Sequence, residues 1–530
     1  MSFLGLLVAS LGLAPLATTA SAQVSPHQSG TSGIFVPVTP FRVLDTRSST
    51  GGTPFGPNTT EPVTVEGAGS GTVPTTGVTA VVATVTALKA TGNGYLQIFP
   101  AAGGLPSVSN LNYRTGQTVP NLVTVPVAAN GQVDIHSYIY NQASTGSVQV
   151  LMDISGYYTT SVTGTSGLFN PITPVRIADT RANSGQPDSG TALASKSTTA
   201  LTVTGSADGV PSSASAVVLN VTVAGPTAGG FLTVWPAGAS QPTASNLNFV
   251  AGQVVANRVI VGIGSAGQVD LYNSFGSTNV IVDVNGWYTG SSGGTGSAYF
   301  PVTPTRVVDT RSSFGGTPIA AAGSENFTLA GSGDIPATGA TAAVLNVTAV
   351  ATPASGYLTV WPSSAAKPTA SDVNWSGTFQ AVPNLTQVGL GTAGAISIFN
   401  GGPGTVGVLV DVFGYFGASN VTGVGISSCT ANATPCPAGD TASTVGEGGT
   451  LYLTATVDKS GAPINADGVL FTLSGTACGS LASATETTGA NGTTPTDAYT
   501  AGATTGTCTV TATSATLGTS STLVITTTTP

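Results

Sequence analysis

The chain has 530 residues, of which 41% are hydrophobic and only 6% are charged, with 12 basic residues against 21 acidic ones and a formal net charge of −9. This acidic balance provides no basic surface for nucleic acid or for an anionic membrane. The length exceeds that of one ordinary domain, and the many Gly (71) and Pro (33) residues favour short strands and turns over long helices.

Residues 1–22 resemble a secretory signal peptide. An apolar run extends from Phe3 to Ala17, and Ala20-Ser21-Ala22 fits a small-residue cleavage site, although no Lys or Arg precedes the run. We therefore expect a secreted protein that is extracellular or associated with the cell surface. The alternative is an N-terminal membrane anchor, for which the run is short, and no later run is apolar enough to span a bilayer.

The middle of the chain repeats itself three times. The segments "PVTPFRVLDTR", "PITPVRIADTR" and "PVTPTRVVDTR" begin at Pro37, Pro171 and Pro301. Later segments match in the same order, including "GYLQIFP", "GFLTVWP" and "GYLTVWP". A repeat of this length is a whole domain rather than one unit of a solenoid. The predicted domains are 33–160, 167–290 and 298–417, with linkers rich in Gly, Ser and Thr between them.

Within each copy the hydrophobic pattern has a period of two. "AVVLNVTVAG" from Ala216 and "NVIVDVNGWY" from Asn279 are typical of strands, and turn residues separate such runs. The sequence therefore predicts an all-β protein with three homologous antiparallel β-sandwich or barrel-like domains in tandem. We expect these domains to form an extended array.

Six of the eight arginines occur in the repeated motif, and aspartates recur with them. The recurring residues are Arg42, Asp45, Arg47 and Asp153 in the first copy, Arg176, Asp179, Arg181 and Asp283 in the second, and Arg306, Asp309, Arg311 and Asp411 in the third. Strand alternation places the first arginine and the first aspartate of each motif on opposite faces. The favoured interpretation is a partly buried structural ion cluster that ties the first strand to the last, because an unpaired carboxylate in an apolar strand is unfavourable. The alternative is a clamp for an anionic ligand.

Aromatic residues before proline provide the candidate ligand-binding positions. These are Phe99, Trp235 and Trp361. In "FLTVWP", Phe231, Thr233 and Trp235 share one face, and a stripe of this kind that faces outward could stack on sugar rings or on a partner protein. The favoured interpretation, however, is that the rings fill the second side of a sandwich or cover a contact between domains.

Signals of catalysis are weak. No phosphate loop, zinc-spaced Cys/His set or calcium-loop pattern occurs, so we expect no cofactor and no metal site. His136 occurs in the first copy alone and is interpreted as an ordinary strand residue. A glycosidase needs two convergent carboxylates, whereas the recurring acids here stand beside arginines. We therefore expect a protein that is not an enzyme.

All four cysteines follow the third copy. An even number in an exported chain predicts two disulfides, and four cysteines allow three connectivities. The preferred pairs are Cys429–Cys436 as a local loop and Cys478–Cys508 as a tie between strands.

The segment "LYLTATVDKSGAPINADGVLFTLSG", with the later "GANG" and "YTAGATTGTCTVTAT", resembles the bacterial immunoglobulin-like domains of the invasin and intimin type. That resemblance implies a small β-sandwich over 421–527 that serves as a stalk or spacer in surface proteins. The three copies, through "PVTPTRVVDTR", "GYLTVWP" and "VDVNGWY", resemble repeated domains of secreted actinobacterial proteins, which implies an exported accessory module with no established ligand.

These observations predict a secreted, non-catalytic protein of the cell surface or extracellular matrix with a structural or adhesive role. Tandem copies support such a role because they raise the effective concentration at a multivalent surface. The alternative is a carbohydrate-binding accessory protein that acts on cell-wall or extracellular polysaccharide. The expected partners are a glycan, a cell-wall polymer or a surface protein, and self-association is left open.

Overall fold

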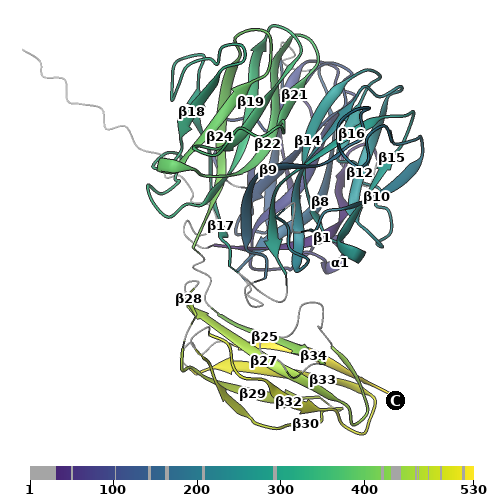
Figure 1. Cartoon of the computed structure of the whole chain (residues 1–530), viewed down its shortest axis with the longest axis vertical. Coiled ribbons are helices and arrows are strands. Elements are labelled where there is room, and N and C mark those ends of the chain that lie inside the picture. Colours follow the sequence, from purple (N-terminus) through teal and green to yellow (C-terminus); the bar gives the residue numbers. More distant parts are fainter. Residues whose placement is uncertain are drawn as a thin grey trace, which may run out of the picture.

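The computed structural model describes residues 32–48, 52–101, 103–140, 145–160, 166–205, 209–290, 295–418, 423–430, 432, 443–459, 462–463, 465–475, 477–489, 492–515 and 520–529. These residues form strands almost throughout, so the predicted all-β class is confirmed (Figure 1). No helix among them is long and apolar enough to cross a bilayer.

The first three domains, here called repeat 1 (34–159), repeat 2 (169–289) and repeat 3 (298–417), each contain eight strands. Repeat 1 consists of β1 (Ile34–Asp45), β2 (Thr59–Thr64), β3 (Val78–Leu88), β4 (Gly94–Pro100), β5 (Leu111–Tyr113), β6 (Val119–Pro126), β7 (Gln132–Ile139) and β8 (Gln149–Thr159), with the short helix α1 (Ala68–Gly71) after β2. Repeat 2 consists of β9 (Phe169–Asp179), β10 (Ser197–Thr202), β11 (Ala214–Ala224), β12 (Gly230–Pro236), β13 (Leu247–Phe249), β14 (Val254–Gly262), β15 (Gln268–Asn273) and β16 (Asn279–Thr289). Repeat 3 consists of β17 (Ala298–Asp309), β18 (Ser324–Thr328), β19 (Ala342–Thr352), β20 (Gly356–Pro362), β21 (Val373–Trp375), β22 (Phe379–Gly389), β23 (Ala395–Asn400) and β24 (Gly407–Gly417).

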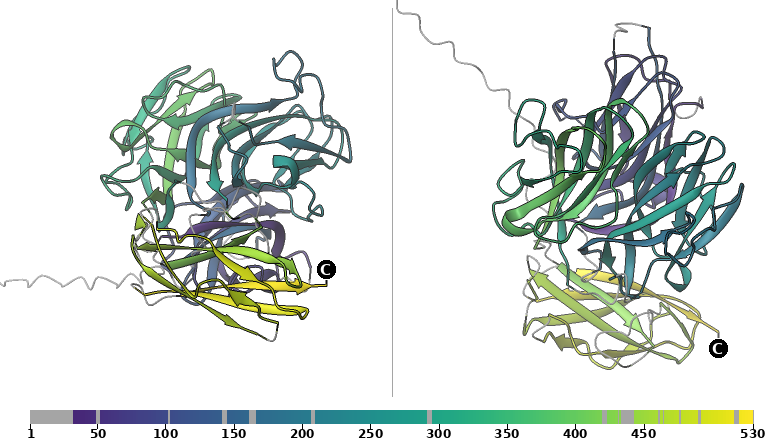
Figure 2. Two further views of the ribbon diagram at one scale, coloured as in Figure 1. Left: turned by 60° about the horizontal axis from the view of Figure 1, so that its bottom comes forward. Right: turned by 45° about the horizontal axis from the view of Figure 1, so that its top comes forward.

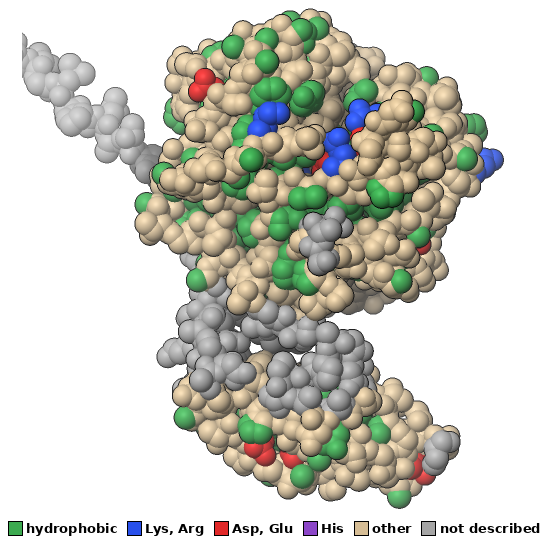
Figure 3. Space-filling view, viewed as in Figure 1, with side chains coloured by type: hydrophobic (Ala, Val, Ile, Leu, Met, Phe, Trp, Pro, Cys, Tyr) green, Lys and Arg blue, Asp and Glu red, His purple; other side chains and the backbone are tan. Residues whose placement is uncertain are grey.

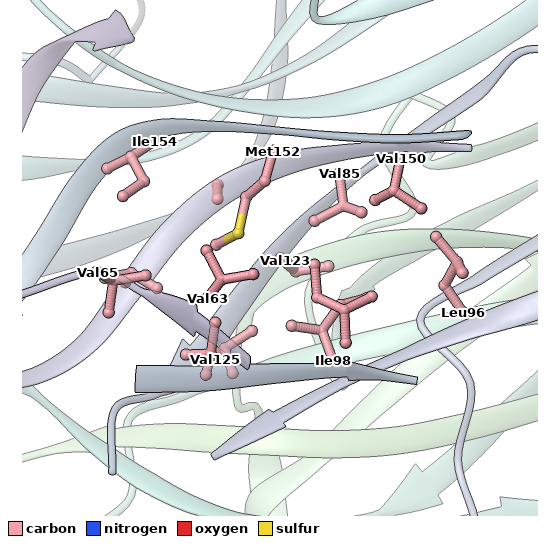
Figure 4. Packing of buried hydrophobic residues seen from close by; sticks show 14 of the residues in the cluster. Val63, Val65, Val85, Leu96, Ile98, Val123, Val125, Val150, Met152 and Ile154 are labelled. Carbon is pink, nitrogen blue, oxygen red and sulfur yellow. The ribbon is translucent and has the colours of Figure 1, made fainter. Parts of the chain in front are cut away.

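Each repeat is a sandwich of two four-stranded antiparallel sheets. In repeat 1 the strand orders are β1-β8-β3-β6 and β2-β7-β4-β5, and the other two repeats have the same topology. The inward side chains of the two sheets meet in a core that includes Val85, Met152 and Ile154 from one sheet and Val63 and Ile98 from the other (Figure 4). The alternating residues that predicted strands are thus the residues that fill the sandwich.

The three repeats pack around a common centre, so the expectation of an extended array is wrong (Figure 2). The start of each first strand pairs with a neighbouring repeat through its backbone. Phe35 N–H donates to Gly167 O at 2.9 Å, Phe169 N–H donates to Ser297 O at 2.8 Å, and Gly33 N–H donates to Tyr299 O at 2.8 Å. These three contacts close a ring, so the chain forms a pseudo-trimer from a single polypeptide.

The C-terminal domain (423–528) is a separate sandwich. Its strands are β25 (Gly423–Cys429), β26 (Thr444–Gly446), β27 (Thr450–Lys459), β28 (Ala462–Pro463), β29 (Gly468–Ser474), β30 (Ser480–Leu481), β31 (Thr485–Thr487), β32 (Asp497–Thr500), β33 (Gly506–Ser514) and β34 (Ser520–Thr528). They form the sheets β25-β27-β32-β30 and β26-β34-β33-β29-β31, which share one hydrophobic core. The predicted Cys478–Cys508 disulfide is confirmed, with an S–S distance of 2.07 Å.

Cys429 is also disulfide-bonded. Its predicted partner Cys436 lies outside the described residues, so that pairing stays a prediction.

Candidate functional site

The structure brings the recurring charges of repeat 1 together on β1 and β8. Arg42 binds Asp153 through two contacts, from Nε to Oδ1 at 2.8 Å and from Nη2 to Oδ2 at 3.0 Å. Its Nη1 also donates to Asp45 Oδ2 at 3.2 Å, and Arg47 Nη2 donates to the same oxygen at 2.6 Å. Asp153 is almost completely buried, at 2% exposure, so the arginine fork compensates a carboxylate that is shielded from water.

Repeats 2 and 3 contain the same cluster. Arg176 Nε donates to Asp283 Oδ1 at 2.9 Å, and Arg306 Nε donates to Asp411 Oδ1 at 2.7 Å. The second arginine of each motif contacts the motif aspartate at 2.6 Å, from Arg181 to Asp179 and from Arg311 to Asp309. The first strand and the last strand of each repeat are therefore tied by an ion pair.

Strand alternation does not describe these motifs, because the first strands contain β-bulges. The register between β1 and β8 shifts between Arg42 and Leu44, and the register between β17 and β24 shifts between Arg306 and Val308. The extra residue turns the side chain that follows, which lets Arg42 reach Asp45 as well as Asp153. The expectation of opposite faces for Arg42 and Asp45 is thus wrong.

The first arginine of the motif also reaches the neighbouring repeat. Arg42 Nη2 donates to the carbonyl of Thr243 in repeat 2 at 3.4 Å, and Arg176 Nη2 donates to the carbonyl of Thr369 in repeat 3 at 3.0 Å. Arg306 makes no equivalent bond to any described residue. The ion clusters therefore support two of the three interfaces between repeats and leave the interface between repeats 3 and 1 different.

The motif aspartates titrate at lower pH than a free aspartate. Hydrogen bonds from Arg47 lower the pKa of Asp45, and hydrogen bonds from Arg311 lower the pKa of Asp309. Burial raises the pKa of Asp153 despite its contact with Arg42. The motif aspartates, rather than the aspartates of the last strands, are therefore the carboxylates that the arginines hold ionised at low pH.

The candidate aromatic residues do not form a surface platform. Phe99, Trp235 and Trp361 are 3%, 3% and 5% exposed, so the expectation of an outward aromatic stripe is wrong. The indole N–H of Trp235 donates to Ala239 O and that of Trp361 donates to Ala365 O. Each tryptophan thus fixes the turn that follows its own strand, and a sugar has no access to these rings.

A ring of asparagines surrounds the pseudo-threefold axis, and sequence reasoning missed it. Asn121 Oδ1 accepts from Leu385 N–H at 3.2 Å, and Asn257 Oδ1 accepts from Leu122 N–H at 3.2 Å. Asn384 Oδ1 closes the cycle by accepting from Arg258 N–H at 3.1 Å. The signal was present in the sequence, because the three asparagines recur at the same position of each copy within "VPN" or "VAN".

One charged pair breaks this symmetry. Arg258 in repeat 2 is completely buried and forms an ion pair with Asp372 in repeat 3, which is 1% exposed. The counterparts of Arg258 are Leu122 and Leu385. The pair therefore distinguishes the interface between repeats 2 and 3 from the other two.

Seven aromatic rings belong to the buried centre of the ring of repeats, and six of them, two from each repeat, come from the first and last strands at equivalent places, while Phe413 of repeat 3 is the seventh. The six are Phe35 and Tyr158 of repeat 1, Phe169 and Tyr288 of repeat 2, and Tyr299 and Phe416 of repeat 3. The hydroxyl groups of Tyr158 and Tyr288 lie 2.6 Å apart, and the rings of Tyr158 and Tyr299 stack with centroids 4.3 Å apart. The aromatic residues on the first and last strands of each copy thus join the repeats to one another.

A cavity of about 550 Å³ lies where repeat 3 meets repeat 1, beside the pseudo-threefold axis. Side chains from all three repeats line it, among them Arg306 and Ser107 from the two sides of the interface. Ser107 is the counterpart of Thr243 and Thr369, which accept the arginine bonds at the other two interfaces. The cavity therefore occupies the interface at which that bond is missing.

The last candidate residue, His136, has the environment of an ordinary strand residue. His136 is 4% exposed, its Nδ1 lies 2.8 Å from Thr60 Oγ1, and burial lowers its pKa. Within the described part of the chain no three His, Cys, Asp or Glu side chains are grouped as metal ligands would be.

No family model matches the chain, and no curated protein matches it. The structure of the Sulfolobus turreted icosahedral virus aligns with 75% of this chain and 100% of its own chain at 9% identity and a TM-score of 0.15. E. coli alpha-2-macroglobulin aligns with 94% of this chain and 40% of its own, also at 9% identity and a TM-score of 0.15. Similarities this low carry no argument.

Proposed function

We propose that this protein is a secreted, non-catalytic component of the cell surface or extracellular matrix with a structural or adhesive role. One observation carries the proposal. The first arginine of each motif, the aspartate of each last strand and the recurring aromatic residues lie inside the repeats or between them, where they hold three sandwiches in one body. Such a body presents several outer faces in a fixed arrangement, which suits attachment at more than one point.

The surface and the C-terminal domain agree with this role. Figure 3 shows a face on which most side chains are uncharged, with most of its few basic side chains near the middle of the three-repeat body and one at its right edge. The Cys478–Cys508 disulfide is compatible with an oxidising compartment outside the cytosol. A disulfide-tied sandwich after the three-repeat body would serve as a spacer.

The location of the protein on intact cells tests the proposal. Antibody labelling of unpermeabilised producer cells, with fractionation of the culture medium, is expected to find the protein outside the cell. A strain that lacks the gene should attach less well to surfaces or to other cells. Recovery of the protein in the cytosol alone would overturn the proposal.

The second candidate function is carbohydrate binding. The buried rings of Trp235 and Trp361 no longer support it, but the polar cavity between repeats 3 and 1 does.

A further inference from the structure

We propose that the cavity between repeats 3 and 1 binds an uncharged carbohydrate chain. At about 550 Å³ it lies within the range of roughly 300–1,000 Å³ that is typical of ligand pockets. This inference takes its biological setting from the proposed surface role, but the binding itself depends only on the cavity.

Three of the five asparagines that line the cavity come one from each repeat. They are Asn112, Asn248 and Asn374, which occupy the same position in each copy. The side-chain oxygen of each accepts a hydrogen bond from a serine of its own repeat, with Oγ–Oδ1 distances of 3.2 Å from Ser109, 3.2 Å from Ser245 and 3.0 Å from Ser371. Each amide NH₂ group therefore points away from its serine, and no described residue accepts a hydrogen bond from it. The lining therefore offers donors that suit hydroxyl oxygens.

An aromatic wall stands on the repeat 1 side. Tyr95 and Tyr140 line the cavity, and Tyr140 is 46% exposed. Tyr95 stacks on Tyr138 with ring centroids 5.1 Å apart, and Tyr138 meets Tyr140 edge to face at 5.5 Å. Ser274 and Gly401 occupy the position of Tyr138 in the other repeats, so this group of rings belongs to repeat 1 alone. Amphipathic rings held in this way can pack against the apolar face of a sugar.

Repeat 3 forms the opposite wall with Arg306 and Arg311. Tyr140 and Arg311 line the same cavity from these two sides. Arg306 is held by Asp411 and Arg311 by Asp309, so the aspartates compensate both positive charges. No acidic side chain is among the described residues of the lining. Arg114 also lines the cavity, where it donates to Thr378 O at 3.4 Å, so each of the three guanidinium groups already has a partner in the protein. The lining therefore suits a ligand with many hydroxyl groups and no net charge.

The geometry also explains why this interface, and not the other two, would hold a ligand. At the other interfaces Arg42 and Arg176 close the gap by donating to Thr243 and Thr369 of the next repeat. Arg306 and Ser107 instead both face the cavity. The ligand would occupy the space that the bond fills elsewhere.

The test is calorimetric titration of the mature full-length protein with defined oligosaccharides. The neutral probes are glucan, mannan, xylan and arabinogalactan oligomers, and the acidic probe is a polygalacturonate oligomer. We expect at least one neutral probe to bind and Tyr140→Ala to weaken it at least tenfold. The matched control is Phe275→Ala, which removes an exposed aromatic ring of repeat 2 outside the cavity lining and should leave the affinity unchanged.

A second variant, Asn374→Leu, examines the other side of the site and should also weaken binding at least tenfold with unchanged thermal unfolding. The inference is overturned if none of the probes binds, if the acidic probe binds best, or if Phe275→Ala weakens binding as much as Tyr140→Ala. A protein that is found on the cell surface but binds none of these sugars would retain the proposed surface role and lose only this site.

Discussion

At the scale of single residues, the same side chain serves two structural purposes. Arg176 compensates the buried Asp283 within repeat 2 and also donates to the carbonyl of Thr369 in repeat 3. Sequence reasoning identified the charged residues of this cluster from their recurrence. It could not identify Thr369 as an acceptor, because a backbone carbonyl 193 residues away leaves no mark on the pattern.

Replacement of Arg176 by Ala should lower the free energy of unfolding by about 3–5 kcal/mol, because it leaves Asp283 buried without its cation. Denaturant unfolding of the full chain measures this. The matched control is Arg311→Ala, whose side chain is 54% exposed and whose loss should cost about 1 kcal/mol or less. Equal losses for the two variants would contradict a structural role that depends on burial.

The stability should also depend on pH through Asp309. Arg311 lowers the pKa of the Asp309 carboxyl in the folded state. At a pH between this lowered pKa and the ordinary aspartate pKa of about 3.9, the unfolded chain therefore binds more protons than the folded protein. The stabilisation is therefore present above pH ~4 and disappears as the pH falls. Asp309→Asn should reduce this acid sensitivity in unfolding experiments at pH 2–6, whereas Glu325→Gln, an exposed acid of β18 in the same repeat, should leave it unchanged.

At the scale of strands, sequence patterns predicted most of the architecture. Period-two alternation identified the strands, and the recurrence of whole segments identified three domains of one kind. The bulges in β1 and β17 were not predicted, because a single extra residue shifts every later side chain without changing the composition. The cavity was not predicted either. Its lining comes from loops and strands of all three repeats, and the sequence did not show that these segments lie side by side.

The last strand of each repeat contains a glycine beneath an aromatic ring. A Cβ atom at Gly156 would lie 2.3 Å from the ring of Phe35, and one at Gly414 would lie 2.3 Å from the ring of Tyr299. Gly156→Ala should therefore lower the free energy of unfolding by about 1–3 kcal/mol through overpacking. Gly104→Ala in the same repeat, where a Cβ atom meets nothing within 4 Å, is the control for thermal unfolding. A larger loss for Gly104→Ala would contradict this explanation.

At the scale of the whole molecule, the Arg258–Asp372 ion pair distinguishes the interface between repeats 2 and 3 from the other two interfaces. Repeat 1 has Leu122 and Asn110 at the corresponding positions, so the other interfaces do without a buried charge. The pair could not be predicted, because Arg258 stands in an apolar strand and its partner belongs to another copy.

A double-mutant cycle tests this pair. Arg258→Leu alone should lower the free energy of unfolding by about 3–5 kcal/mol because it leaves Asp372 buried without a partner. The double variant Arg258→Leu/Asp372→Asn reproduces the residues of repeat 1 and should recover most of that loss. Chemical unfolding of the four proteins gives the coupling energy, and a double variant less stable than Arg258→Leu would contradict the prediction.

The aromatic centre has a consequence for how such a gene can change. Tandem domains that fold independently can be duplicated or deleted by recombination, and each remaining domain still folds. Here each repeat contributes at least two rings to a closed centre, so deletion of one copy would expose Tyr158, Tyr288 or Phe416 to water. A fourth copy could not pack around the pseudo-threefold axis, because the ring is already closed. The packing of the aromatic centre therefore restricts the number of copies to three.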